Sequence, residues 1–375
     1  MRRLSKPQEL RTKCHLLYVV GQLGAGGLER QLYLLLRTLD RDRYRPEVVV
    51  WNFLEDDTYV HALRDLAIPL HFFSGHHSRL AKLKAFRRLV LKLKPEVIHS
   101  YSFYTNFAAW WAAAGTKTIA VGGIRSDFSN DKKSSGIILG SLSARWPSNQ
   151  IYNNFAAAEK AKNSRTLFAP RNVFVVPNGL DLQQFPKVPL LSNGQARILG
   201  VGSLLQYKRW DRLLTAALKL KQRGLQFVVE IAGGGPLRES LERQARDLDI
   251  TDRVKFVGHA DDVAGVMGKS TFIAHTSDVE GCPNVLMEAM ACGRAVVATD
   301  AGDASSLIED GKSGFVVRRG DDQALTDRMA ALIMDQDLCR RMGEAGRVKA
   351  EREFGLDRLV EETLAAYRTA AFSEF

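Results

Sequence analysis

Two glutamates lie eight residues apart in HTSDVEGCPNVLMEAMACGRAVVATDAG, which covers residues 275–302. Between Glu280 and Glu288, Pro283 suits the first position of a helix, and Gly293 is well placed to end that helix. A helix that begins there directs backbone N–H groups toward a bound anion. A carboxylate beside a phosphate is costly unless it binds hydroxyl groups, and sugars offer hydroxyls in pairs. The spacing therefore favours one glutamate on a transferred sugar and one on a ribose. The alternative is that both only add negative charge at the start of a helix.

A lysine earlier in the same half of the chain could serve the same site. Lys208 lies in VGSLLQYKRW (201–210), after the end of an apolar strand and before a helix. Its ammonium group can therefore reach the carboxyl edge of the sheet, where it would stabilise a departing diphosphate as charge develops. The alternative is a solvated surface lysine.

The first half of the chain carries a histidine and a glycine-rich turn where strands are expected to end. His99 ends the apolar run in EVIHS, and Tyr101 follows two residues later. His99 is either a site residue or a satisfied, partly buried histidine, and Tyr101 could act in its place. Gly26 and Gly27 follow the first apolar run. The sequence GAGGLE lacks the third glycine of a dinucleotide-binding fingerprint, and no ribose-binding acid is evident.

Short apolar runs alternate with amphipathic helical segments along the whole chain, the pattern of parallel sheets covered on both faces. The alternation restarts near residues 180–195, where Pro, Gly and Asn collect. We predict an α/β protein of two doubly wound, Rossmann-like domains that face each other across a cleft. The domains expected are residues 1–182 and 183–355, with a C-terminal helix at 356–375 packed back on the first domain. The clearest segments are the strands at 13–20, 44–53, 197–203 and 226–235, and the helices at 27–40, 78–94 and 209–224.

The segment EGCPNVLMEAMACGRAVVATDAG resembles the donor-site signature of retaining glycosyltransferases of family 4, which adopt the two-domain GT-B fold. Further segments similar to family hallmarks occur in the expected order. They are GAGGLERQ (24–31), VVPNGLDLQQF (175–185), VGSLLQYKRWDRLL (201–214), AGGGPLRESLE (232–242), VKFVGH (254–259) and EDGKSGFVV (309–317).

The resemblance implies a role for each candidate residue. It places the donor site in residues 183–355 and the acceptor side in residues 1–182. The implied catalytic residues are Glu280, Lys208 and His99. The implied donor-binding residues are Gly26, Gly27, Ser203, Gly281, Pro283, Asn284 and Glu288. Two positions depart from the family pattern, because Ser203 stands where an arginine is usual and Tyr101 stands where a second histidine is common.

The activity implied is transfer of a sugar, with retention, from a nucleoside diphosphate sugar to a glycan or lipid-linked acceptor. Lipopolysaccharide, capsule or exopolysaccharide assembly is the expected pathway. No metal cofactor is expected, because the D-x-D pairs at 247–249 and 335–337 lie in polar helical segments. The alternatives are another GT-B activity, such as sucrose or glycogen synthesis or sugar epimerisation, a dehydrogenase, and a catalytically inactive scaffold.

The net charge of +11 is concentrated in the first half of the chain. Residues 1–180 carry 27 Lys and Arg against 13 Asp and Glu, whereas the remainder carries 26 against 29. The segment RLAKLKAFRRLVLKLK (79–94) holds seven basic residues and no acid, with Lys84, Arg88 and Lys92 on one side of the expected helix. This face predicts peripheral contact with anionic membrane. A nucleic-acid partner is not expected, because no array of stacking aromatics accompanies the charges.

The chain is expected to be cytoplasmic, at the inner face of the plasma membrane where the basic helix makes contact. The apolar run HLLYVV is short and leads directly into a turn, as a first strand does and a signal peptide does not. Four cysteines without paired spacing are expected to be thiols of the core.

Overall fold

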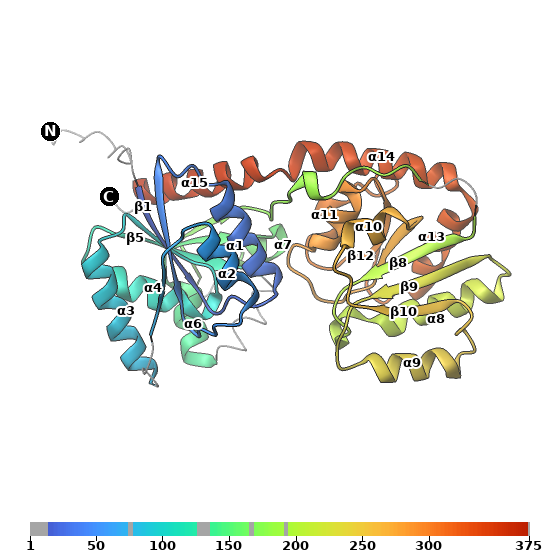
Figure 1. Cartoon of the computed structure of the whole chain (residues 1–375), viewed down its shortest axis with the longest axis horizontal. Coiled ribbons are helices and arrows are strands. Elements are labelled where there is room, and N and C mark those ends of the chain that lie inside the picture. The colour runs from blue at the N-terminus through green and yellow to red at the C-terminus, as the bar shows by residue number, and fades with distance from the viewer. Residues whose placement is uncertain (1–13, 74–77, 126–135, 165–168, 191–193, 374–375) are drawn as a thin grey trace. The chain divides into compact units, whose positions relative to one another are not determined.

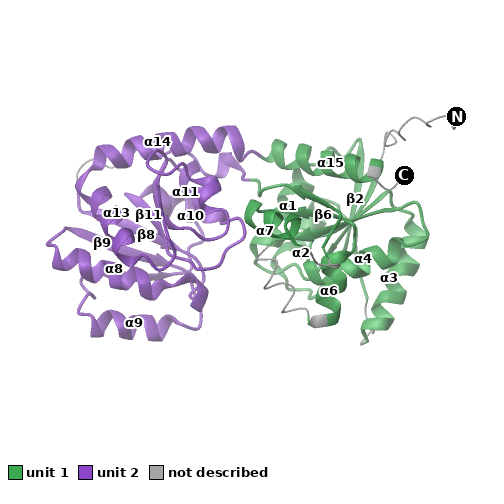
Figure 2. Ribbon diagram, turned by 180° about the vertical axis from the view of Figure 1, so that it is seen from behind, with its two compact units in different colours: residues 1–179, 356–375 green, residues 180–355 purple. Residues whose placement is uncertain are grey.

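The computed structural model describes residues 14–73, 78–125, 136–164, 169–190 and 194–373. The chain divides into two compact units, residues 1–179 with 356–375 and residues 180–355 (Figure 2). Both are Rossmann-like α/β units with parallel sheets, as the alternating pattern predicts. No helix among the described residues is long and apolar enough to cross a membrane.

Unit 1 is built on a parallel sheet with the strand order β3-β2-β1-β4-β5-β6-β7 (Figure 1). Every residue of β1 is buried, as expected of a strand covered on both faces. Its strands are β1 (Cys14–Val20), β2 (Tyr44–Val50), β3 (Leu70–Phe72), β4 (Val97–Ser100), β5 (Ile119–Ile124), β6 (Asn149–Tyr152) and β7 (Asn172–Val175). Its helices are α1 (Gly27–Thr38), α2 (Thr58–Asp65), α3 (Arg79–Leu93), α4 (Asn106–Ala113), α6 (Ile137–Arg145), α7 (Phe155–Lys162) and α15 (Leu356–Ser373).

The last helix, α15, belongs to unit 1 although unit 2 precedes it in the sequence. Leu359, Tyr367 and Ala370 of α15 are buried in the same apolar core as Leu16 and Tyr18 of β1. Arg358 donates hydrogen bonds to the carbonyls of the segment that leaves β7. The C-terminal helix thus completes the core of the first unit.

Unit 2 repeats the architecture with the strand order β10-β9-β8-β11-β12-β13. Its strands are β8 (Ala196–Val201), β9 (Phe227–Ala232), β10 (Val254–Gly258), β11 (Phe272–His275), β12 (Ala295–Thr299) and β13 (Phe315–Val317). Its helices are α8 (Trp210–Gln222), α9 (Arg238–Asp247), α10 (Val263–Gly268), α11 (Asn284–Ala291), α12 (Ala304–Leu307), α13 (Asp322–Met334) and α14 (Gln336–Glu353). The four cysteines of the chain are buried thiols, as expected.

Two glycines let α14 pack closely on the segment that follows α11. A Cβ at Gly343 would lie 2.1 Å from the carbonyl oxygen of Gly293, and a Cβ at Gly346 would lie 3.3 Å from Met290. The first distance is impossible without movement of backbone. Both contacts are at the C-terminal end of α11, the helix whose N-terminus belongs to the candidate site, so this packing holds α11 in place.

We expect Gly343→Ala to lower the free energy of unfolding by about 2 kcal/mol, because the added methyl group forces α14 away from Gly293. Chemical denaturation measures the change. The control is Gly355→Ala, since nothing lies within 4 Å of a Cβ there. Equal stability of the two variants would show that α14 does not depend on this contact.

Candidate functional site

The sheet of unit 2 has a point where the strand order reverses. β8 pairs with β9 on one side and with β11 on the other, and later strands continue outward from each. Ligands of open α/β sheets bind at such a switch point, beyond the carboxyl ends of the strands. Lys208 follows β8 and Glu280 follows β11, so both lie in loops at this edge.

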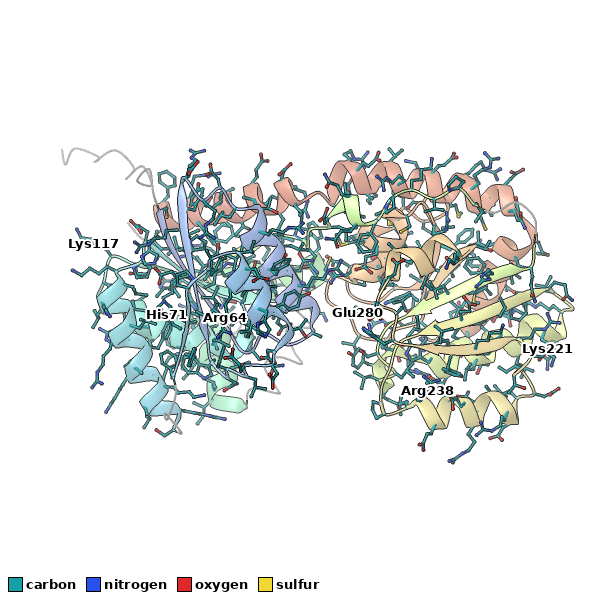
Figure 3. All side chains as sticks on the ribbon, in the orientation of Figure 1. Arg64, His71, Lys117, Lys221, Arg238 and Glu280 are labelled. Atoms are coloured by element: carbon teal, nitrogen blue, oxygen red, sulfur yellow. The ribbon has the colours of Figure 1, made fainter. Side chains whose placement is uncertain are left out.

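Glu280, labelled in Figure 3, has a largely buried carboxylate, with 13% of its side chain exposed, and two partners. Lys208 Nζ donates to Glu280 Oε1 over 2.6 Å, and His275 Nε2 lies 3.1 Å from the same oxygen. Burial by itself would raise the pKa of Glu280, but His275 and Lys208 together lower it to about 2. The site therefore holds an ionised carboxylate next to an ammonium group at neutral pH.

The loop that carries Lys208 is attached to the end of β11 by three interactions. The Thr276 hydroxyl donates to the Lys208 carbonyl over 2.9 Å, and the Asp278 backbone N–H donates to the Tyr207 carbonyl over 2.8 Å. Arg209 donates to the Asp278 carboxylate over 2.7 Å. Arg209 has a φ of 53°, a left-handed conformation that a residue with a side chain adopts at some cost. These contacts aim Arg209 away from Glu280 and leave Lys208 directed at it.

The loop after β12 supports the other side of Glu280. Gly302 has a φ of 58°, and a Cβ there would lie 2.2 Å from the Gly281 carbonyl oxygen. Asp303 donates its backbone N–H to that same oxygen over 3.0 Å. The last glycine of the signature is therefore required by the close approach of two loops.

Helix α11 begins one residue later than the sequence predicts. Pro283 is the residue before the helix, with extended backbone (ψ 101°), and Asn284 is the first helical residue. The assignment of Pro283 to the first helical position was wrong by one, because its ψ is not helical. Gly293 follows the helix with a φ of 71°, as expected of a residue that ends it. Glu288 lies one turn into α11 and is 5% exposed.

Ser203 is exposed in the loop between β8 and Lys208, and its carbonyl accepts a hydrogen bond from Trp210 Nε1 over 3.0 Å. Its hydroxyl is too short to act as the arginine that is usual in the family. Lys208 is consequently the cation that the described structure places on Glu280.

Unit 1 has its own switch point, between β1 and β4. His99 lies in β4 and is 1% exposed, and its Nδ1 is 2.6 Å from the hydroxyl of Tyr367 in α15. Burial, and then the charge of Arg125, lower the pKa of His99 well below its usual value, so the ring is neutral. The Tyr367 hydroxyl donates to Tyr18 over 3.4 Å. When the Tyr367 hydroxyl donates to Tyr18, His99 Nδ1 is the donor in the 2.6 Å bond, and the lone pair of the neutral ring is on Nε2.

Tyr101, directly after β4, is fully buried and its ring centroid lies 4.7 Å from that of His99. Gly26 precedes α1 and Gly27 is its first residue, both at the carboxyl end of β1. The φ of Gly26 is −121°, which any residue can adopt, and a Cβ there would meet only the flexible Glu29 side chain at 2.1 Å. The conformation of Gly26 does not itself require glycine.

The candidates predicted from sequence thus fall into two groups. Lys208 and Glu280 touch, with the other donor-site candidates in the same loops or in α11, whereas His99, Gly26 and Gly27 belong to unit 1. Sequence reasoning missed His275, Asp278 and Tyr367. His275 and Asp278 could have been found, since they flank the end of the strand before Glu280. Tyr367 could not, because only folding brings α15 to β4.

No group of three His, Cys, Asp or Glu side chains in the described ranges is arranged to hold a metal ion. Metal independence stays a prediction.

Two family models match consecutive parts of the chain. The model described as glycosyltransferase family 4 matches residues 25–184, and the one described as glycosyl transferases group 1 matches residues 182–349. The chain belongs to the family 4 glycosyltransferases. This membership confirms the resemblance seen in the signature around Glu280 and Glu288.

Individual relatives and a solved structure agree with the family. An uncharacterised glycosyltransferase of Haemophilus influenzae is 30% identical over 196 residues, which are 52% of this chain and 55% of the relative. A GDP-mannose-dependent phosphatidylinositol monomannoside mannosyltransferase of Mycolicibacterium smegmatis is 32% identical over 190 residues, 46% of this chain and 50% of the relative. The matches thus span about half the length of these proteins.

The crystal structure of HepE from Anabaena in complex with UDP is similar over 96% of this chain and 100% of HepE. The TM-score is 0.80 at 20% sequence identity, so the similarity concerns the fold. It confirms the GT-B architecture of two Rossmann-like units.

The lowered pKa of Glu280 should make stability depend on pH. Because folding lowers this pKa from 4.5 to about 2, the stabilisation is complete above about pH 5 and is lost as the pH falls toward 2. We expect the wild type to lose roughly 3 kcal/mol more than Glu280→Gln over this interval.

Urea unfolding between pH 7 and pH 3 will show most of this difference. Glu239→Gln, which removes an exposed carboxylate of unit 2, is the control and should follow the wild type. Parallel curves for the wild type and Glu280→Gln would contradict an ionised, compensated carboxylate.

Proposed function

We propose that this chain transfers a sugar, with retention of configuration, from a nucleoside diphosphate sugar to a hydroxyl of a glycan or lipid-linked acceptor. The observation that carries the proposal is the pairing of Lys208 with a buried, ionised Glu280 at the switch point of unit 2, just before the N-terminus of α11. Family membership supports the reaction class.

In this proposal the donor phosphates lie at the N-terminus of α11, where backbone N–H groups and the helix dipole favour negative charge. Lys208 exchanges part of its contact with Glu280 for the diphosphate and stabilises it as it leaves. Glu280 then takes hydroxyls of the transferred sugar, and Glu288 takes those of the ribose. Ser203, Gly281, Pro283 and Asn284 line the same loops. Lys208 and the helix N-terminus supply the positive charge, so no divalent metal is needed.

On the acceptor side, we propose that the Nε2 lone pair of His99 accepts a hydrogen bond from the attacking hydroxyl, with Tyr101 beside it. The position of His99 in β4, its neutral ring and its bond to Tyr367 support this role. Gly26 and Gly27 lie at the neighbouring strand end. The mannosyltransferase relative, named for a phosphatidylinositol monomannoside, favours a lipid-linked acceptor. Assembly of lipopolysaccharide, capsule or exopolysaccharide is the proposed pathway.

We expect Glu280 and Glu288 to divide the donor between them. A panel of nucleotide sugars first identifies the donor by thermal stabilisation, since a ligand at 100 times its Kd adds about 2.7 kcal/mol. Glu280→Gln should then lower kcat by about a hundredfold, because charge develops on the sugar in the transition state. Glu288→Gln should weaken donor binding roughly tenfold and change kcat little, because the ribose does not react.

Calorimetry with the free nucleoside diphosphate checks the division, and Glu239→Gln serves as the control variant. The diphosphate should bind Glu280→Gln almost normally and Glu288→Gln poorly. Equal losses in both, or none in either, would refute the assignment. Stabilisation by no nucleotide sugar would refute the function itself. Activity lost in a chelator and restored by magnesium or manganese would refute metal independence.

We also propose peripheral binding of α3 to anionic membrane at the cytoplasmic face. Phe86 and Val90 of α3 are buried against the sheet, while Lys84, Arg88 and Lys92 are exposed. Leu80 and Leu91 are 71% and 48% exposed and fall near the same face by helical periodicity. Exposed leucines among cations suit an interface of anionic headgroups and acyl chains.

Replacing Lys84, Arg88 and Lys92 by Gln should weaken binding to anionic vesicles on the order of a hundredfold, at roughly 1 kcal/mol per cation. Cosedimentation with vesicles measures it, and binding should fall with added salt. The matched control replaces three exposed cations of unit 2, Arg243, Arg246 and Lys255, by Gln. Equal loss in both triple variants, or equal binding to neutral vesicles, would argue against α3 as the contact.

A further inference from the structure

Arg125, the residue after β5, is a cation for which the described residues supply no partner at two of its donors. Its guanidinium carbon lies 3.9 Å from the centroid of the Tyr101 ring. Within the described part of the chain, neither Nε nor Nη1 of Arg125 has a hydrogen-bond partner, although both atoms are buried. No ion pair of Arg125 occurs there either. Leaving buried guanidinium donors unpaired is costly, so the arrangement favours an anion.

Two other arginines of the same unit pair most of their guanidinium donors, although Nε of Arg358 is buried without a partner among the described residues. Arg87 donates to the Trp111 carbonyl over 2.7 Å, although it too lies against that tryptophan ring. Arg358 donates to the carbonyls of Pro177 and Asn178 and to Glu362. An arginine with a purely structural role would be expected to pair its guanidinium donors with groups of the protein in the same way. Arg125 therefore has N–H donors available for a ligand, whereas the corresponding donors of Arg87 and Arg358 mostly bind groups of the protein.

Two fully buried polar groups beside Arg125 are also unsatisfied. The Tyr101 hydroxyl and His99 Nε2 find no hydrogen-bond partner among the residues that the structure describes. Both side chains are at most 1% exposed. All three groups come from the carboxyl ends of β4 and β5, next to the switch point between β1 and β4, where open α/β sheets bind ligands.

The backbone is shaped to bring Arg125 to this place. A Cβ at Gly123 would lie 2.4 Å from the carbonyl oxygen of Ser100 and 3.4 Å from Tyr101 Cα. Only glycine allows β5 to come so close to the end of β4. Arg125, two residues later, is thereby held over the Tyr101 ring, which limits the orientations of its planar fork.

We propose that Arg125, with Tyr101 and His99, binds an anionic group of the acceptor, a phosphate ester or a carboxylate. This inference rests on the proposed function in that it assigns the site to the acceptor. The guanidinium pairs with the oxyanion, the Tyr101 hydroxyl donates to it or to a neighbouring oxygen, and His99 Nε2 accepts from the attacking hydroxyl. Neutral sugars without such a group would be poor acceptors.

Inorganic phosphate tests the site without knowledge of the acceptor. In nitrogen-15 spectra of the full chain, the Arg125 Nε–H signal is the one that disappears in Arg125→Lys. Phosphate should shift this signal saturably, and glycerol at the same concentration should not. Arg125→Gln should bind phosphate at this site roughly ten- to a hundredfold more weakly than the wild type does. A competition titration measures this difference. Acetate, titrated in parallel, distinguishes a preference for carboxylate from one for phosphate.

The Lys208→Gln variant separates this site from the donor site. The phosphate-dependent shift of Arg125 should persist in that variant, and its loss there would overturn the proposal. So would a shift that does not saturate or that glycerol reproduces.

Nucleotide-sugar binding distinguishes the two ideas. The nucleotide sugar should stabilise Arg125→Gln against thermal unfolding to the same extent as it stabilises the wild type. Donor binding without a phosphate response refutes the acceptor anion site alone. A phosphate response without any donor refutes the glycosyltransferase function and leaves an anion site.

Discussion

A buried carboxylate has to be compensated where it lies, and this requirement shapes unit 2 around Glu280. Its two partners come from different strands, Lys208 from the loop after β8 and His275 from the end of β11. They meet because β8 and β11 are neighbours although two strands separate them in the chain. The left-handed Arg209, its bond to Asp278 and the approach of Gly302 all serve to keep this pairing in one geometry.

The two units use the same architecture for different electrostatics. In unit 2, Arg209 and Arg212 share Asp278 and pair also with Asp211 and Asp322, so each of these cations next to Lys208 has a counter-charge. In unit 1, the equivalent edge carries a neutral histidine, a buried tyrosine and Arg125, which has no counter-charge among the described residues. One site has its charges paired within the described residues, and for the other we propose an anion. This contrast fits a donor that brings its phosphates to a helix N-terminus and an acceptor with a charge of its own.

Charge and burial also explain what the two departures from the family pattern, Ser203 and Tyr101, change at their sites. Ser203 is exposed, and its hydroxyl carries no charge, so it cannot replace a second cation beside Lys208. Tyr101 occupies the place of a second histidine with a hydroxyl that does not titrate near neutrality, since burial raises its pKa. The stacked Arg125 partly offsets that rise and ties the tyrosine to the cation beside it.

The alternation of apolar runs and amphipathic helices determined two Rossmann-like halves, because strands buried on both faces must be apolar throughout. Pro283, Gly293 and the spacing of the glutamates determined α11 to within one residue, because turn and cap geometry is local. Only the tertiary structure brought Lys208 onto the carboxylate of Glu280, and Tyr367 of the last helix onto His99. Those contacts depend on strand order and on the return of α15, which join residues 72 and 268 positions apart in sequence. No local sequence pattern encodes such pairs, because the two residues of each pair meet only after the strands between them have assembled into the sheet.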